Sequence, residues 1–148
     1  MKAVKEVMRT NVPTISPEDP VRKATKTMRD NNVWGLPVVD EGKIEGIITD
    51  GDILNAFYLG VSVFSYEENV GRDDETKKFR ERIEEFRNLK VRDVMTLHPR
   101  TISDKAGVDE AAAMLKRFKI KRLIAVDEKG KLVGLVERLN VVDSILSE

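Results

Sequence analysis

The chain contains one sequence unit twice, and this repeat restricts the possible folds more than any other feature. Val7-Met8 recurs 87 positions later as Val94-Met95, and Leu36–Asp40 corresponds to Leu123–Asp127 at the same spacing. The remaining matches are Thr14-Ile15-Ser16 with Thr101-Ile102-Ser103 and, after one inserted residue, Gly46-Ile47-Ile48 with Gly134-Leu135-Val136. So many matches in one order do not arise by chance. The chain is therefore two copies of one unit with a joining segment between them.

Both units predict the same order of elements. In the first, a short strand at Thr14-Ile15 precedes a helix over Val21–Asn31, whose apolar residues recur at helical spacing. Two apolar strands follow, Leu36–Val39 and Ile44–Thr49, joined by a tight turn, and a second helix covers Asp52–Leu59. The corresponding elements of the second unit are Thr101-Ile102, Val108–Phe118, Leu123–Val126, Leu132–Val136 and Leu139–Leu146. The order is β-α-β-β-α, so the expected fold class is mixed α/β (α+β).

The joining segment differs in composition from both units. Glu75–Asn88 is dense in lysine, arginine and glutamate, and Phe79, Ile83 and Phe86 recur at helical spacing. This pattern predicts an amphipathic helix with one apolar stripe. The stripe either packs on its own domain or a symmetry mate, or forms a docking site for a partner protein. Ser62–Asp74, which precedes the helix, is expected to be a loop.

The composition excludes several classes of site. The chain has no cysteine and one histidine, His98, so disulfides, thiolate catalysis and His-rich metal sites are impossible. Twenty-six basic residues balance 26 acidic ones, and this neutrality argues against a dedicated nucleic-acid binder. The apolar runs are too short to span a membrane, and no secretory signal is visible. A soluble, cytoplasmic protein is the expectation.

The order of motifs resembles a known module. Each unit carries Val-Met near its start and Thr-Ile on its first strand, and Gly-Ile-Ile-Thr-Asp-Gly-Asp-Ile marks a strand-to-helix junction in the first. This arrangement resembles a tandem pair of cystathionine β-synthase (CBS) domains, also called a Bateman module. The resemblance implies repeats at 1–60 and 90–148, related by a pseudo-twofold axis, and a linker with the charged helix at 61–89. It also implies clefts between the repeats and a disc-like homodimer.

The junction after the third strand of the first unit is the main candidate site. Thr49 and Asp52 have the spacing of a helix N-cap and its third residue, so a plain capping arrangement is one interpretation. The other is ligand binding, since a carboxylate can accept two hydrogen bonds from the vicinal hydroxyls of a ribose, and a threonine hydroxyl can donate to a phosphate. The resemblance favours the second interpretation. Asp50, in the same junction, belongs to the predicted ligand-binding set.

The second unit departs from this pattern. Glu137 replaces the threonine and Asn140 replaces the aspartate. A carboxylate repels an incoming phosphate, and an amide binds hydroxyls less strongly than a charged acceptor does. We therefore expect the cleft of the second repeat to be empty or weak for nucleotides.

The remaining predicted contacts follow from the resemblance. The pseudo-twofold axis implies that Lys121 and Arg122 face the phosphate of a ligand held by Asp52, and a guanidinium suits a phosphate. Thr14 and Ile15 are expected to bind the base by backbone hydrogen bonds and an apolar wall. Leu36 and Pro37 are expected to supply the other wall. A solvated strand edge is the alternative for Lys121 and Arg122, and a core or interface role is the expectation for Trp34.

The resemblance implies a regulatory module rather than an enzyme. The expected ligand is an adenine nucleotide (AMP, ADP or ATP) in one cleft between the repeats, with no required cofactor. Binding would shift the module or its dimer between conformations and be transmitted to a regulated partner protein. Four alternatives remain: an S-adenosylmethionine-type ligand, a ligand-free interaction module, a phosphohydrolase using Asp50 and Asp52 to hold Mg²⁺, and nucleic-acid binding through the basic residues near Lys77.

Overall fold

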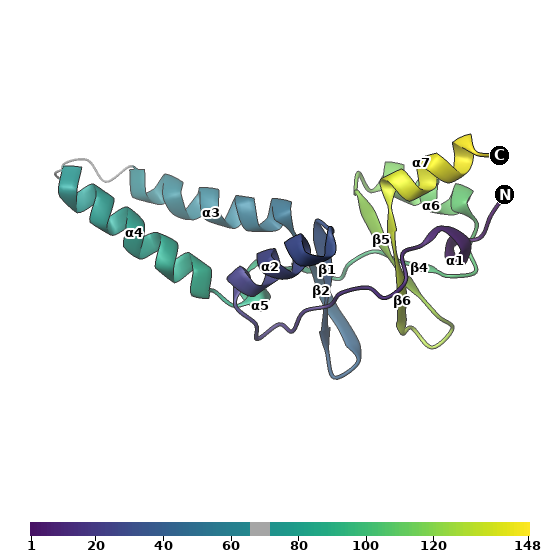
Figure 1. Ribbon diagram of the computed structural model, residues 1–148, viewed down its shortest axis with the longest axis horizontal. Coiled ribbons are helices and arrows are strands. Elements are labelled where there is room, and N and C mark those ends of the chain that lie inside the picture. The colour runs from purple at the N-terminus through teal and green to yellow at the C-terminus, as the bar shows by residue number, and fades with distance from the viewer. Residues whose placement is uncertain (66–71) are drawn as a thin grey trace. The chain divides into compact units, whose positions relative to one another are not determined.

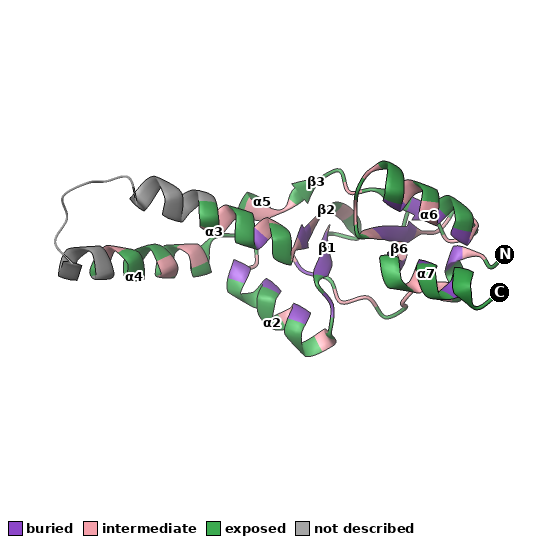
Figure 2. Ribbon diagram, turned by 90° about the horizontal axis from the view of Figure 1, so that it is seen from above, coloured by how far each residue is buried: buried purple, intermediate pink, exposed green. Residues whose placement is uncertain are grey.

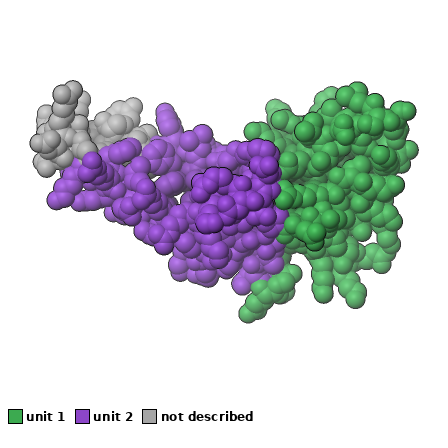
Figure 3. All heavy atoms as spheres, viewed as in Figure 1, with its two compact units in different colours: residues 1–12, 41–44, 98–148 green, residues 13–40, 45–97 purple. Residues whose placement is uncertain are grey.

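The computed structural model describes residues 1–65 and 72–148, with the side chains of residues 1–58 and 77–148. Figure 3 shows two compact units: unit 1 comprises Met1–Val12, Glu41–Ile44 and His98–Glu148, and unit 2 comprises Pro13–Asp40 and Glu45–Leu97. In chain order the elements are α1 Val4–Val7, α2 Val21–Asn31, β1 Gly35–Asp40, β2 Lys43–Thr49, α3 Asp50–Ser65, α4 Arg72–Asn88, α5 Val91–Val94, β3 Thr96–Leu97, β4 Thr101–Ser103, α6 Val108–Arg117, β5 Arg122–Val126, β6 Leu132–Glu137 and α7 Arg138–Leu146. The mixed α/β fold class is confirmed.

Unit 2 is built on a three-stranded sheet in the order β1-β2-β3, with α2 and α3 over one face (Figure 1). The apolar stripe of α2 is buried because Val21, Ala24 and Met28 recur at helical spacing and pack on the sheet. The sheet contributes Leu36, Val38 and Ile48 to this core, and α3 contributes Ile53. Figure 2 shows the buried residues on the strands and on the inner side of α2.

The first strand of the first repeat is shorter than predicted. Instead of a strand at Thr14-Ile15, Ile15 alone forms a parallel bridge to Val38. The Ile15 N–H donates to Pro37 at 3.1 Å, and the Ile15 carbonyl accepts from Val39 at 2.9 Å. Prolines at both ends of this segment, Pro13 and Pro17, have no N–H to extend the ladder.

Unit 1 repeats this architecture. Its sheet has the order β4-β5-β6, with β4 parallel to β5 and β5 antiparallel to β6. In Figure 1, α6 and α7 lie on the same side of this sheet. The core is separate from that of unit 2 and consists of Val4, Ile102, Val108, Ala111, Leu115, Leu123, Ala125, Val136 and Val141.

Each unit contains the leading segment of the other unit's repeat: α1, at the start of the first repeat, belongs to unit 1, and α5, at the start of the second repeat, belongs to unit 2. Val4 of α1 is buried in the core of unit 1, and its N–H donates to Ala106 at 2.8 Å. Val91 of α5 is buried in the core of unit 2, and its N–H donates to Asp19 at 2.8 Å. The compact units therefore divide the chain differently from the sequence repeats at 1–60 and 90–148.

The helices around the joining segment are longer than predicted. α3 extends to Ser65 rather than ending at Leu59, and α4 begins at Arg72 rather than at Glu75. The prediction of a loop over Ser62–Asp74 is therefore wrong at both ends of that range, and residues 66–71 lie outside the described residues.

The apolar stripe of the charged helix contacts its own unit. Phe57 of α3 makes edge-to-face ring contacts with Phe86 at 5.3 Å and with Phe79 at 6.4 Å between ring centroids. Phe86 also packs on the core of unit 2. This confirms the interpretation that the stripe packs on its own domain, and it explains why α3 and α4 run side by side in Figures 1 and 2.

Within the described part of the chain, no helix is both long enough and apolar enough to cross a membrane.

Candidate functional site

The junction between β2 and α3 holds the two residues that the sequence singled out. The Thr49 hydroxyl accepts a hydrogen bond from the Asp52 N–H at 3.0 Å, and Asp52 Oδ2 accepts one from the Thr49 N–H at 3.0 Å. This reciprocal pair is a capping box, so the capping interpretation is realised in the structure. The capping box leaves both side chains with unused hydrogen-bonding capacity. The Thr49 hydroxyl still has a proton to donate, and the carboxylate has further lone pairs.

A third residue orients the same carboxylate. The Thr96 hydroxyl donates to Asp52 Oδ1 at 3.0 Å. Thr96 lies on β3, where it pairs with Ile47 while Leu97 pairs with Gly46. Thr96 was not predicted from the sequence, because it is far from Asp52 along the chain and lies in the leading segment of the other repeat. The available signal was the repeated Val-Met motif, which Thr96 follows directly.

The structure divides the predicted base-binding residues between two faces of the sheet. Ile15 and Leu36 are buried in the core under the helices, so their side chains are not on the other face. Thr14 and Pro37 have the opposite orientation, because side chains alternate along extended chain. Ile47, Thr49 and Thr96 share the face of Thr14 and Pro37, since Ile48 points into the core. On this face Thr14 is exposed, whereas Pro37 is buried.

Trp34 and Asp50 border a different feature of unit 2. They line a hollow of about 290 Å³ together with Thr25, Met28, Arg29, Asn32 and Val33. Trp34 is 55% exposed, so it is not a core residue, and the other role expected for it, at an interface, stays a prediction. Asp50 is exposed, and its Oδ1 accepts from the Gly51 N–H at 2.9 Å. Asp50 is the one predicted ligand-binding residue of unit 2 at this hollow; Thr49 and Asp52 are not among its lining residues.

The corresponding junction of unit 1 has different chemistry. The Glu137 N–H donates to Asn140 Oδ1 at 3.1 Å, which reproduces half of the capping box. The position of Thr96 is taken by Arg9, which bridges Leu135 as Thr96 pairs with Ile47. In unit 1, therefore, the amide of Asn140 stands where unit 2 has the carboxylate of Asp52, and Arg9 stands where unit 2 has the hydroxyl of Thr96.

Arg122 is the first residue of β5 in unit 1, and Lys121 directly precedes it. Lys121 is exposed, and its carbonyl accepts from the Arg138 N–H at 2.9 Å. Arg122 is directly opposite Glu137 in the antiparallel ladder. Arg122 Nε and Glu137 Oε1 are each buried without a hydrogen-bond partner. The strand-edge interpretation therefore fits Lys121 better than Arg122, because Arg122 has a buried guanidinium nitrogen that an anion could satisfy.

No cluster of three or more histidine and acidic side chains that could hold a metal ion occurs within residues 1–58 and 77–148.

Comparisons with known proteins agree with the repeated architecture. The family model described as "CBS domain" matches residues 4–59 and 91–147. A CBS domain-containing protein of Dictyostelium discoideum is 33% identical over 144 residues, which cover 97% of this chain and 90% of that protein. An inosine-5'-monophosphate dehydrogenase of Korarchaeum cryptofilum is 32% identical over 131 residues, and the chain spans 22% of that protein.

The structural comparison covers both repeats at once. The crystal structure of CBSX2 in complex with AMP superimposes with a TM-score of 0.73 at 27% identity, and covers 99% of this chain and 98% of that one. The family model accounts for both repeats and omits the segment that contains α4. The resemblance inferred from the motifs is thus confirmed, and the chain belongs to the CBS domain family, with a pair of CBS domains as its fold.

Proposed function

We propose that the chain is a regulatory module that binds an adenine nucleotide through the Thr49–Asp52 junction of unit 2. The observation that carries the proposal is the orientation of Asp52, whose two carboxylate oxygens are each fixed by one donor at 3.0 Å. A carboxylate held in this way presents its remaining lone pairs in a defined direction, which suits the paired hydroxyls of a ribose. The relative CBSX2, solved with AMP, supports the choice of ligand.

The rest of the proposed site consists of the residues predicted from the sequence, but they contribute in different ways. Thr14 is proposed to contact the base by its side chain, because it is exposed on the sheet face of Thr49. Pro37 shares that face but is fully buried, so its side chain is not accessible to a base in this structure. Ile15 and Leu36 would contribute through their backbones alone, since their side chains are in the core. Asp50, Lys121 and Arg122 complete the set, with Lys121 and Arg122 proposed to neutralise the phosphate.

The proposal is tested by thermal unfolding of the wild-type chain with AMP, ADP, ATP, S-adenosylmethionine and GTP. A ligand at about 100 times its dissociation constant adds about 2.7 kcal/mol, which for a chain of this size raises the midpoint by roughly 5–10 °C. We expect this shift with an adenine nucleotide. Asp52→Ala should abolish the shift, and the matched variant Asn140→Ala in the other repeat should retain it.

Two outcomes would refute the proposal. The first is the absence of a shift with every adenosine compound at millimolar concentration. The second is an equal shift in the wild type and Asp52→Ala. A shift with S-adenosylmethionine alone would show that the ligand is an adenosyl compound and not a nucleotide. Lys121 and Arg122 would then have no role in binding, because basic side chains do not attract a sulfonium cation.

The output of the module is proposed to be a change in assembly or in a partner protein, in the cytoplasm and without catalysis by the chain itself. Exposed apolar side chains on α7 support self-association, because Leu139, Val142 and Ile145 are 74, 46 and 41% exposed. On α3, Leu54 and Tyr58 are also exposed. We propose that a second copy of the chain covers these side chains in a homodimer.

Val142→Glu is expected to weaken this homodimer at least about tenfold, because a charge would be buried in an apolar contact. Analytical ultracentrifugation over a range of protein concentrations measures the effect. Lys129→Glu, in the exposed turn between β5 and β6, is the control and should leave the dimer intact. A wild-type chain that sediments as a monomer at every concentration would refute this part of the proposal.

A further inference from the structure

We propose that Thr96 is the positioning residue for Asp52, and that it couples ribose binding to the docking of the connector Leu89–Leu97 on unit 2. This inference rests on the proposed function, because it assigns to Asp52 the ribose hydroxyls of the nucleotide. It goes further by naming a residue outside the first repeat that determines how well those hydroxyls are recognised.

The Asp52 carboxylate is held by two hydrogen-bond donors. Its Oδ2 accepts from the Thr49 N–H and its Oδ1 accepts from the Thr96 hydroxyl, each at 3.0 Å. The hydrogen bond from the Thr49 N–H holds only Oδ2, so by itself it would let the plane of the carboxylate turn. The second donor, the Thr96 hydroxyl, holds Oδ1 and so fixes that plane. Each oxygen then keeps lone-pair capacity for one further donor. Two such oxygens in a fixed plane match the two hydroxyls of a ribose.

The position of Thr96 is determined by backbone structure. Thr96 and Leu97 pair with Ile47 and Gly46 of β2. A Cβ atom built on Gly46 would lie 2.6 Å from the Thr96 carbonyl oxygen and 3.0 Å from Met95 Sδ. The connector thus approaches β2 closely only because position 46 has no side chain. The hydroxyl of Thr96 is held beside Asp52 by this close pairing.

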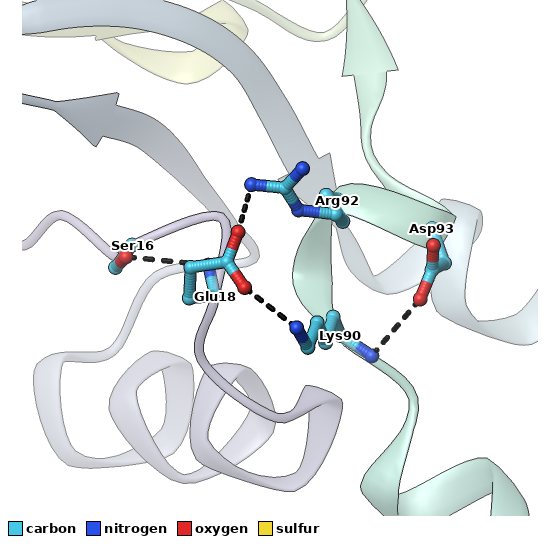
Figure 4. Close-up of polar contacts among 5 residues, drawn as sticks. All are labelled: Ser16, Glu18, Lys90, Arg92 and Asp93. Atoms are coloured by element: carbon cyan, nitrogen blue, oxygen red, sulfur yellow. Dashed lines mark hydrogen bonds and ion pairs between the residues drawn. The ribbon is translucent and has the colours of Figure 1, made fainter.

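The rest of the connector is anchored on the same unit. Its buried residue Val91 lies in the core, and the Leu89 carbonyl accepts from the Val21 N–H at 2.8 Å. Figure 4 shows Glu18 between Lys90, at 2.7 Å, and Arg92, with which it also pairs. Glu18 lies three residues after Ile15, so the connector contacts the chain that follows the predicted base-binding segment, and it contacts the Asp52 carboxylate through Thr96.

Unit 1 lacks this arrangement. Arg9 occupies the position of Thr96, and Asn140 occupies that of Asp52. The hydroxyl donor and the carboxylate acceptor therefore occur together in unit 2 and are both replaced in unit 1.

Coupling follows from this geometry by thermodynamic reciprocity. If the Thr96 contact improves ribose binding, then bound ribose stabilises the docked connector by the same factor. The connector runs along the chain from α4 to His98, where unit 1 resumes, so bound nucleotide would stabilise the segment that links the two units.

The test compares AMP with 2′-deoxy-AMP, by isothermal titration calorimetry, on the wild type, Thr96→Val and Thr96→Ser. Valine has the shape of threonine without the hydroxyl, and serine keeps the hydroxyl. We expect Thr96→Val to weaken AMP binding by about three- to tenfold, the range for loss of one ordinary hydrogen bond, because solvent exposure weakens the bond between Thr96 and the charged Asp52. Binding of 2′-deoxy-AMP should weaken less, and Thr96→Ser should retain the wild-type preference for ribose.

A second readout addresses the connector. AMP should increase the hydrogen-exchange protection of the Val91 N–H in the wild type and in Thr96→Ser, and less so in Thr96→Val. Thermal unfolding without ligand establishes that each variant is folded.

The inference is overturned if Thr96→Val binds AMP like the wild type, or if it loses AMP and 2′-deoxy-AMP binding by equal factors. In both cases the wild type binds AMP, so the proposed function survives. If the wild type does not bind AMP, the proposed function fails and the inference fails with it.

Discussion

Replacing Val4 with aspartate is expected to remove a large part of the stability of unit 1, whose remaining chain lies mostly after residue 97, and to leave unit 2 as stable as before. Val4 is fully buried beside residues of α6, β5 and β6 in the core of unit 1. An uncompensated carboxylate in such a core costs about 3–5 kcal/mol. That is a large part of the roughly 5–15 kcal/mol by which a domain is stable.

Hydrogen exchange resolved by residue measures this effect. In Val4→Asp, protection should be lost in α6 and β5 and retained in α2 and β1. The mirror variant Val91→Asp should give the opposite pattern, because Val91 is fully buried in the core of unit 2. Loss of protection in α2 and β1 after Val4→Asp, with α6 still protected, would contradict the exchange of the leading segments between the units.

Replacing Gly46 with valine is expected to destabilise unit 2 by about 3 kcal/mol, near the upper end of the usual cost of overpacking. A Cβ at this position would lie 2.6 Å from the Thr96 carbonyl oxygen, which belongs to the backbone and cannot rotate away. Valine adds two further methyl groups. The connector must therefore move away from β2, and Thr96 would lose its hydrogen bond to Asp52.

Chemical denaturation of the wild type and Gly46→Val measures the change in the free energy of unfolding. Gly51→Ala is the matched control, because its Cβ would meet only Thr49 Oγ1 at 3.6 Å and alanine favours the helix. We expect Gly51→Ala to be neutral or stabilising. A Gly46→Val chain as stable as the wild type would contradict the close approach of β3 to β2.

Most of the regular elements could be predicted from local sequence. α2 occupies the predicted range Val21–Asn31, because the apolar spacing and the residues around its ends all favour the same helix. The length of α3 could not be predicted. Gly60 favours a helix end, yet α3 continues to Ser65. The ring contacts of Phe57 with Phe79 and Phe86 bring α3 and α4 together, and such contacts between distant residues have no local signature.

The candidate site was predictable only where its residues are close in the chain. Thr49 and Asp52 are separated by one helical turn, so their spacing alone indicated that they form a pair. Thr96 reaches Asp52 through a strand pairing that local sequence does not encode. The pairing of Arg122 with Glu137 could not be predicted for the same reason, because it depends on the register of the β5–β6 hairpin.

The amino-acid sequence by itself determined that the chain is a repeated β-α-β-β-α module, that its two junctions differ in chemistry, and that Thr49 and Asp52 form a pair. These properties depend on composition, periodicity and short spacing. The tertiary structure alone decided which core each leading segment enters. Val4 and Val91 stand in equivalent motifs, and either valine suits either apolar core, so local preferences do not choose between the two. The choice depends on strand pairing and packing between residues that are far apart in the chain, and this is also what places Thr96 beside Asp52.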